Sequence, residues 1–267
     1  MLRSLLFLLL LPLSAKDFDL YLLAGQSNMD GRGKTTKLTE AQKQPSETAI
    51  IFYRNPPSSS DGWQPLAPGF SIPPKHKSGV PSPTFGPEIG FIAHLSKAQP
   101  EKRFALIKGS KGGTNLRADW KPGLKGQPDT QGPRYRDFIE TIKLAKAALK
   151  KDGHSATLRG LIWHQGESDS RTDAELHQER LTQLIIRIRE DTASPNLPIV
   201  LGQVVDNKKR DSVRTAILKT SQSVSHCGFA SAKDLTTWDP GTHFDARSQL
   251  ILGKRFAEAM LELLNSH

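Results

Sequence analysis

The chain has 267 residues, a formal net charge of +10, and 36% hydrophobic and 24% charged residues. This length fits one large domain or two small ones, and the composition excludes collagen, coiled coil and wholesale disorder. The basic residues are dispersed, with few aromatic side chains among them, so a surface that stacks nucleic-acid bases is not indicated. We expect a solvated basic surface and no nucleic-acid partner; the alternative is weak attraction to an acidic polymer.

Residues 1–15 are predicted to form a signal peptide. Arg3 supplies a positive charge, an apolar run follows at 5–13, and the small residues Ser14 and Ala15 precede a polar stretch. The run is too short to span a bilayer, which favours a cleaved signal over an uncleaved N-terminal anchor. We therefore expect a secreted or periplasmic protein without stable membrane insertion, in which residues 16–267 form a single domain.

Short apolar runs alternate with amphipathic segments along the chain. Continuous apolar runs are typical of strands buried on both faces, and apolar side chains at helical spacing indicate helices. In chain order the pattern predicts a strand at 20–24, a helix at 87–97, a strand at 104–107, a helix at 135–151, a strand at 158–163, a helix at 173–191 with Thr172 as its N-cap, a strand at 198–205, a helix at 213–225, a short strand at 228–232 and a final helix at 246–264. This alternation predicts an α/β fold with a mostly parallel sheet of about five strands between two helix layers.

Two long segments interrupt this alternation. Residues 55–87 are rich in proline, serine and glycine, and residues 118–134 carry three prolines and three glycines. Loops of this length inside a compact domain are usually functional or disordered. We interpret both as excursions over the rim of the sheet.

Polar or glycine-rich segments follow three of the predicted strands: GQSNM at 25–29, KGSKGGTN at 108–115 and HQGESD at 164–169. The carboxyl ends of parallel strands meet at one edge of a sheet, where ligands bind in α/β folds. The three segments are therefore expected to form one site. Ser27 is a candidate nucleophile there, although serine is also a common helix N-cap. Gln165 would donate an amide N–H, and Glu167 would pair with a histidine.

A fourth segment, DPGTHFD at 239–245, precedes the final helix. A carboxylate bonded to the Nδ1–H of His243 would leave Nε2 free to take a serine proton, although a lone histidine is often structural. The Gly-x-Ser-x-Gly elbow of α/β-hydrolases is absent, and so are metal-ligating histidine and cysteine motifs. No metal and no cofactor are predicted.

Together, the blocks at 25–29, 31–33, 112–114, 164–169 and 241–245 resemble those of the sialate O-acetylesterase and acetylxylan-esterase branch of the SGNH hydrolases. The resemblance extends from residue 20 to the C-terminal helix. It implies a flavodoxin-like, three-layer α/β/α fold. It also implies metal-independent removal of O-acetyl groups from a carbohydrate through an acetyl-serine intermediate.

The resemblance also assigns roles to individual residues. Ser27 would be the nucleophile and His243 the general base. The backbone N–H groups of Ser27 and Gly113, with the side chain of Gln165, would form the oxyanion hole.

The acid that orients the histidine is not settled by the resemblance. In the family it lies three residues before the histidine, and here Pro240 stands at that position. Asp239 lies one residue earlier and would reach His243 around the turn at 240–241. Glu167 and Asp245 are the alternatives.

The substrate is left open between acetylated sialic acid, uronic-acid polymers and acetylated xylan. Aromatic side chains in loop-like segments would either stack on sugar rings or pack their own loops; these are Trp63, Trp120 and Trp238. Basic residues near the predicted site would favour an acidic sugar, namely Lys108, Lys111 or Arg117. Two other functions remain possible on sequence alone: an inactive carbohydrate-binding protein of the same fold, and an O-acetyl transferase.

Overall fold

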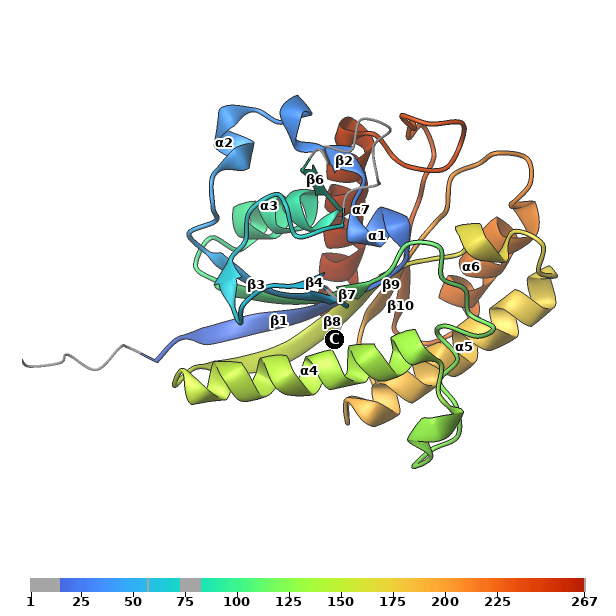
Figure 1. Cartoon of the computed structure of the whole chain (residues 1–267), viewed down its shortest axis with the longest axis horizontal. Coiled ribbons are helices and arrows are strands. Elements are labelled where there is room, and N and C mark those ends of the chain that lie inside the picture. Colours follow the sequence, from blue (N-terminus) through green and yellow to red (C-terminus); the bar gives the residue numbers. More distant parts are fainter. Residues whose placement is uncertain (1–14, 57, 73–82, 267) are drawn as a thin grey trace, which may run out of the picture.

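The computed structural model describes residues 15–56, 58–72 and 83–266, so the predicted signal peptide lies outside the described residues except for Ala15. Within this part of the chain the centre of the molecule is an eight-stranded sheet (Figure 1). In spatial order its strands are β10 (Cys227–Ala230), β9 (Ile199–Gly202), β8 (Ser155–His164), β1 (Asp17–Gly25), β7 (Phe104–Ser110), β3 (Ala49–Asn55) and β4 (Ser58–Ser59), and β5 (Gln64–Pro65) pairs with β3. Neighbours from β10 to β3 are parallel, and β4 and β5 run antiparallel to β3.

The central strand β1 is buried on both faces because apolar side chains occupy successive positions. Leu20 and Leu22 belong to the core on one side of the sheet, and Tyr21 and Leu23 belong to the core on the other. Side chains alternate across a strand, so an uninterrupted apolar run serves two helix layers at once. This arrangement places β1 between β7 and β8 in the middle of the sheet.

Helices cover both faces of the sheet (Figure 1). The core on one side contains residues of α4 (Pro133–Lys151), α5 (Ala174–Asp191) and α6 (Asp211–Ser223). The core on the other side contains residues of α3 (Glu88–Ala98) and α7 (Ala246–Asn265). The predicted three-layer α/β/α class is therefore confirmed.

Several shorter elements lie outside the sheet and its two main helix layers (Figure 1). They are α1 (Ser27–Asp30), α2 (Glu40–Lys43), the two-stranded ribbon of β2 (Gly33–Lys34) and β6 (Thr84–Phe85), and three 3-10 helices at Thr35–Lys37, Pro128–Thr130 and Glu167–Asp169. The described parts of the two predicted loops, 55–87 and 118–134, thus contain short strands and one short helix.

Two details differ from the sequence-based expectation. The sheet has more strands than the predicted five, chiefly because β3 was not anticipated, although residues 49–53 form an apolar run typical of a strand. Helix α5 is capped by Asp173 and not by Thr172: the Asp173 carboxylate accepts hydrogen bonds from the backbone N–H groups of Glu175 and Leu176. None of the helices in the described ranges is long and apolar enough to cross a membrane.

Helices α3 and α7 pack so closely that glycines replace side chains at their contact. A Cβ atom on Gly253 would lie 2.2 Å from the carbonyl oxygen of Pro87 and 2.6 Å from the backbone nitrogen of Phe91. A Cβ on Gly90 would lie 2.2 Å from the carbonyl oxygen of Leu250. This contact fixes the start of α7, and therefore the polar segment 239–245 that precedes it, relative to the sheet.

We expect Gly253→Ala to lower the free energy of unfolding by about 1–3 kcal/mol, because the added methyl group must displace backbone atoms of α3. The loss is expected although alanine is favoured over glycine in a helix interior by about 1 kcal/mol. Urea unfolding followed by circular dichroism measures the change. Gln222→Ala, at an exposed position of α6, is the control and should change stability by less than about 0.5 kcal/mol. Unchanged or increased stability of Gly253→Ala would contradict the close contact.

Candidate active site

The site begins where β1 ends at Gly25. This residue has a φ of +145°, and a Cβ atom there would lie 2.0 Å from the carbonyl oxygen of His164. The same oxygen accepts a hydrogen bond from the backbone N–H of Gln26 at 2.9 Å. Only glycine tolerates this backbone conformation at such a close approach. The turn places Ser27 at the first position of α1, on the carboxyl edge of the sheet.

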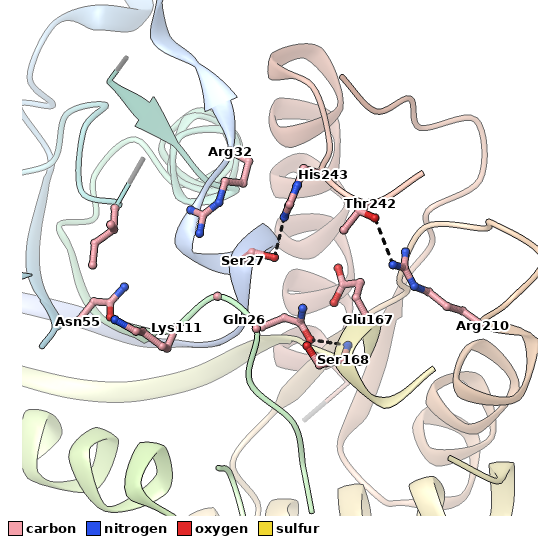
Figure 2. Close-up of a pocket in the computed structure, with 13 residues that line it drawn as sticks. Gln26, Ser27, Arg32, Asn55, Lys111, Glu167, Ser168, Arg210, Thr242 and His243 are labelled. Atoms are coloured by element: carbon pink, nitrogen blue, oxygen red, sulfur yellow. Dashed lines mark hydrogen bonds between the residues drawn. The ribbon is translucent and has the colours of Figure 1, made fainter. Parts of the chain in front are cut away.

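Three side chains form a continuous hydrogen-bonded chain at this edge. The Nε2 atom of His243 lies 3.1 Å from the Oγ atom of Ser27, and its Nδ1 atom lies 2.6 Å from Oδ2 of Asp239. Figure 2 shows the His243 ring directed at Ser27. A carboxylate on Nδ1 holds the imidazole in the tautomer that leaves Nε2 free to accept a proton from the hydroxyl group.

The loop that carries His243 explains how Asp239 reaches it from four residues away. The backbone N–H of Trp238 donates to the carbonyl oxygen of His243 at 3.1 Å, so the segment folds back on itself. Oδ1 of Asp239 accepts from the backbone N–H groups of Thr242 at 3.1 Å and His243 at 2.7 Å. The carboxylate is thereby fixed with Oδ2 facing the imidazole.

The alternative acid Asp245 has a different position. It is the N-cap of α7, where its Oδ1 accepts from the backbone N–H of Ser248 at 2.8 Å. Its Oδ2 accepts from the hydroxyl group of Thr236. Asp245 therefore holds the start of the helix, and its contacts stabilise the carboxylate form and lower its pKa despite the opposing effect of burial.

Glu167 contacts the histidine loop through Asn28. The Asn28 amide donates to Oε1 of Glu167 and, at 2.9 Å, to the carbonyl oxygen of Thr242. Its own Oδ1 accepts from the backbone N–H of Phe244 at 3.0 Å. Asn28 thus holds the backbone on both sides of His243. No hydrogen bond joins Glu167 directly to His243 among the described contacts.

His164, at the end of β8, lies next to Glu167. Its Nδ1 atom is 3.7 Å from Oε1 of Glu167. Complete burial lowers the pKa of His164, although the nearby Glu167 charge opposes this effect. Its ring packs edge-on against that of Phe244.

The side chain of Gln165, expected from the sequence at the oxyanion hole, bonds to polar groups inside the protein. Its side chain is fully buried, and its amide nitrogen lies within hydrogen-bond distance of the carbonyl oxygen of Thr114 at 3.0 Å and of the Asp169 carboxylate. With Oε1 of Gln26 at 3.3 Å, the two N–H donors of this amide are shared among three acceptors inside the protein. Gln165 is not among the residues that line the cavity at Ser27.

Gln26 lies at the cavity instead. Its side-chain oxygen accepts three hydrogen bonds, each at 3.3 Å, from the backbone N–H groups of Gly166 and Ser168 and from the amide of Gln165. Because all three partners are donors, the oxygen must face them, and the amide nitrogen of Gln26 lies on the cavity side (Figure 2). Gln26 was not predicted from the sequence, although its position next to Ser27 was an available signal.

Asp30 forms a buried polar hub beside α1 that was also not anticipated. Its carboxylate pairs with the Arg32 guanidinium at 2.8 Å. Burial and the Asp30 charge both raise the pKa of Tyr53, whose hydroxyl group therefore remains a donor to the hub. The other donors to the Asp30 carboxylate are Asn55, Ser110 and the backbone N–H of Ile72.

The cavity above Ser27 has a volume of about 490 Å³, within the range of small-molecule sites. Figure 2 shows Arg32 and Lys111 on one side of Ser27 and Arg210 on the other. Glu167 is the one acidic residue among those that line it. The remaining lining residues are Gln26, Asn55, Ile72, Gly112, Gly113, Ser168, Thr242 and His243.

Two of the three basic residues proposed from the sequence have other positions. Lys108 is fully buried, and its ammonium group contacts Oε2 of Glu88 at 2.9 Å and the carbonyl oxygens of Asp30 and Phe70, each at 2.8 Å. Lys108 is therefore a core ion-pair partner. Arg117 lines a neighbouring cavity, whereas Lys111 lines the cavity at Ser27.

The three tryptophans also differ in position. Trp63 donates its Nε1–H to the carbonyl oxygen of Ala145, and Trp120 is buried with its Nε1–H on the hydroxyl group of Thr114. Both therefore pack their own loops. Trp238 is 42% exposed, and its ring stacks on that of His243 with centroids 5.7 Å apart.

Residues 17–262 match the family described as carbohydrate esterase, sialic acid-specific acetylesterase. The chain belongs to this family. It is therefore a carboxylic ester hydrolase of the carbohydrate O-acetylesterase class, as the sequence resemblance implied. None of the curated proteins compared with this carbohydrate esterase matches it.

Solved structures show the same fold. A protein from Arabidopsis thaliana is 22% identical with a TM-score of 0.72 and covers 91% of this chain and 98% of its own. NanS is 18% identical with a TM-score of 0.67 and covers 95% of this chain and 99% of its own. A carbohydrate acetylesterase from Xanthomonas citri is 19% identical with a TM-score of 0.63 and covers 93% of this chain and 57% of its own.

In the parts of this esterase that the structure describes, no group of three or more histidine, cysteine, aspartate or glutamate side chains is arranged to hold a metal ion.

We expect Lys108→Met to lower the free energy of unfolding by about 3–5 kcal/mol, because it leaves the buried Glu88 carboxylate without a cation. The double variant Lys108→Met/Glu88→Gln should recover part of this loss, since it removes both charges. Urea unfolding of wild type, both single variants and the double variant measures the coupling. If the double variant were as unstable as the sum of the single variants, the ion pair would not contribute as described.

Proposed function

We propose that this enzyme hydrolyses O-acetyl esters of a carbohydrate through an acetyl-serine intermediate, with Ser27 as nucleophile and His243 as general base. The observation that carries the proposal is the hydrogen-bonded chain from Ser27 through His243 to Asp239, with separations of 3.1 and 2.6 Å. A serine within hydrogen-bond reach of a base that is itself oriented by a third group is the arrangement expected of an activated nucleophile.

In the first half of the reaction, Nε2 of His243 takes the Oγ proton while Oγ of Ser27 attacks the acetyl carbonyl carbon. The tetrahedral intermediate collapses to acetyl-serine, and His243 returns the proton to the departing sugar oxygen. In the second half, His243 takes a proton from a water molecule that attacks the acetyl carbonyl carbon. The second tetrahedral intermediate then collapses: the bond to Oγ of Ser27 breaks, His243 returns the proton to Oγ, and acetate leaves.

We propose Asp239 as the acid that orients His243, and Glu167 as a positioning residue that acts through Asn28. Asp239 contacts Nδ1 of His243 directly, whereas Glu167 contacts the amide that holds the backbone around it. This division of roles explains why both the loop and the block at 164–169 carry a carboxylate.

We propose that the oxyanion is held by the backbone N–H groups of Ser27 and Gly113 and by the side-chain amide of Gln26. Gln26 replaces Gln165 in this role because its amide faces the cavity while that of Gln165 bonds to the core. Donors fixed in advance by other hydrogen bonds need no reorganisation when the charge develops.

The proposed substrates are acetylated sialic acid, xylan or a related polysaccharide. The family description supports a sialic acid ester, and the basic residues Lys111 and Arg210 at the cavity support a substrate with an acidic group. We further propose export with cleavage of residues 1–15, so that residues 16–267 form the mature single domain outside the cytoplasm.

Acetate release from p-nitrophenyl acetate, acetylated xylan and O-acetylated sialic acid tests the mechanism. We expect Ser27→Ala to lower kcat by about 10⁴-fold or more and Asp239→Asn by about 10²- to 10⁴-fold. Glu167→Gln should keep kcat within about tenfold of wild type, since a glutamine oxygen still accepts from Asn28. If Glu167→Gln lowered kcat more than Asp239→Asn did, Glu167 would be the acid that orients His243. Full activity of Ser27→Ala would overturn the proposed function.

The two glutamines give a second prediction. Gln26→Glu keeps an oxygen for the N–H groups of Gly166 and Ser168 but replaces the donor at the cavity with a carboxylate. We expect kcat to fall by about 10²- to 10³-fold, the usual effect of losing one oxyanion donor, with little change in thermal unfolding. Gln165→Met should instead lower the unfolding temperature, because it removes hydrogen bonds to buried acceptors. It should leave kcat of the folded protein within about tenfold of the wild-type value. The opposite result would return the oxyanion role to Gln165.

A further inference from the structure

A second cavity, of about 560 Å³, adjoins the one at Ser27, and Ser168 lines both. Three arginines from different segments converge on it. Arg117 follows β7, Arg171 follows the 3-10 helix Glu167–Asp169, and Arg180 lies in α5. The mechanism proposed above uses none of them.

These three guanidinium groups have no ion pair and no hydrogen bond within the described part of the chain. Arg189, by contrast, donates to the carbonyl oxygens of Leu197, Ser225 and His226. Each guanidinium carries five N–H donors in a planar fork. The second cavity is therefore lined by three positively charged side chains whose N–H donors have no partner in the described part of the protein.

The acidic groups at the same cavity are already occupied. Oδ2 of Asp169 accepts from the backbone N–H of Leu116 at 3.1 Å and from Gln165. Oδ1 of Asp173 caps α5 through the backbone N–H groups of Glu175 and Leu176. Neither carboxylate lies within ion-pair distance of the arginines, so the lining has an excess of unpaired positive charge.

An apolar surface accompanies the charge. Leu176 lines the second cavity and is 41% exposed. Sugar rings present an apolar face together with polar substituents, and a planar guanidinium matches a carboxylate with two parallel hydrogen bonds.

We propose that the second cavity is a subsite for a carboxylate-bearing sugar residue. The enzyme then deacetylates an acidic polysaccharide, such as an acetylated uronic-acid chain, and is not restricted to a monosaccharide. This inference rests on the proposed function. The shared residue Ser168 is its geometric basis, because a chain with its acetylated residue above Ser27 continues directly into the second cavity. The arginines then bind the next acidic residue of the chain.

The test compares acetylated oligogalacturonate, acetylated xylo-oligosaccharide of equal length and p-nitrophenyl acetate. In the triple variant Arg117→Gln/Arg171→Gln/Arg180→Gln we expect KM for the acidic oligosaccharide to rise about tenfold, with KM for the other two substrates unchanged. The wild-type preference for the acidic substrate should shrink at high salt, because exposed charges are screened.

The matched control removes the same charge elsewhere. Lys143→Gln/Lys146→Gln/Lys150→Gln alters three exposed lysines on one face of α4. It should leave KM for acetylated oligogalacturonate unchanged. An equal rise in the control variant would show general electrostatic attraction and overturn the subsite, as would an unchanged KM in the arginine variant.

Direct binding separates the subsite from the catalytic proposal. Titration calorimetry measures unacetylated oligogalacturonate against Ser27→Ala protein with and without the three arginine substitutions. Weaker binding with the substitutions supports the subsite even if wild-type protein released no acetate, which would overturn the proposed function alone. Equal binding by both proteins would overturn the subsite while leaving the proposed function intact.

Discussion

The active site depends on one close backbone contact, where β1 turns at Gly25 against the carbonyl oxygen of His164. No side chain fits there, so the chain leaves the sheet sharply and presents Ser27 at once at the carboxyl edge. Because β1 lies between β7 and β8, the segments that follow those strands are brought to the same place. Ser27, the glycine-rich turn and the block at 164–169 therefore meet without any long loop having to fold over the sheet.

A second level of organisation fixes the polar groups around this edge. Asn28 holds the backbone on both sides of His243, and Gln26 bonds to the segment that carries Glu167. The two neighbours of Ser27 thus connect it to the block at 164–169 and to the histidine loop. Two buried ion pairs lie close to these residues. Arg32 balances the charge of Asp30, and Lys108 balances that of Glu88. Such satisfied buried networks favour one arrangement of the site over its alternatives.

Much of this could be predicted from the sequence because strand ends, glycine turns and apolar periodicity are local signals. The polar blocks at 25–29 and 164–169 were placed correctly at one edge on that basis. Side-chain direction was not predictable in the same way: Gln26 and Gln165 are both amides in polar blocks, and only their long-range partners decide which faces the cavity. Lys108 was misjudged for a similar reason, since its partner Glu88 lies on a helix distant in sequence. The reach of Asp239 depended on a backbone turn that the sequence only suggested.

The distance along the chain between Ser27 and His243, 216 residues, has a consequence for how the enzyme is made. The central strand is translated first, but its parallel neighbours and the histidine loop come much later, and contacts of such high sequence separation form slowly. A partly synthesised chain that ends before residue 243 has Ser27 without the histidine that hydrogen-bonds to it. The hydrogen-bonded chain of the site therefore forms only after translation is essentially complete.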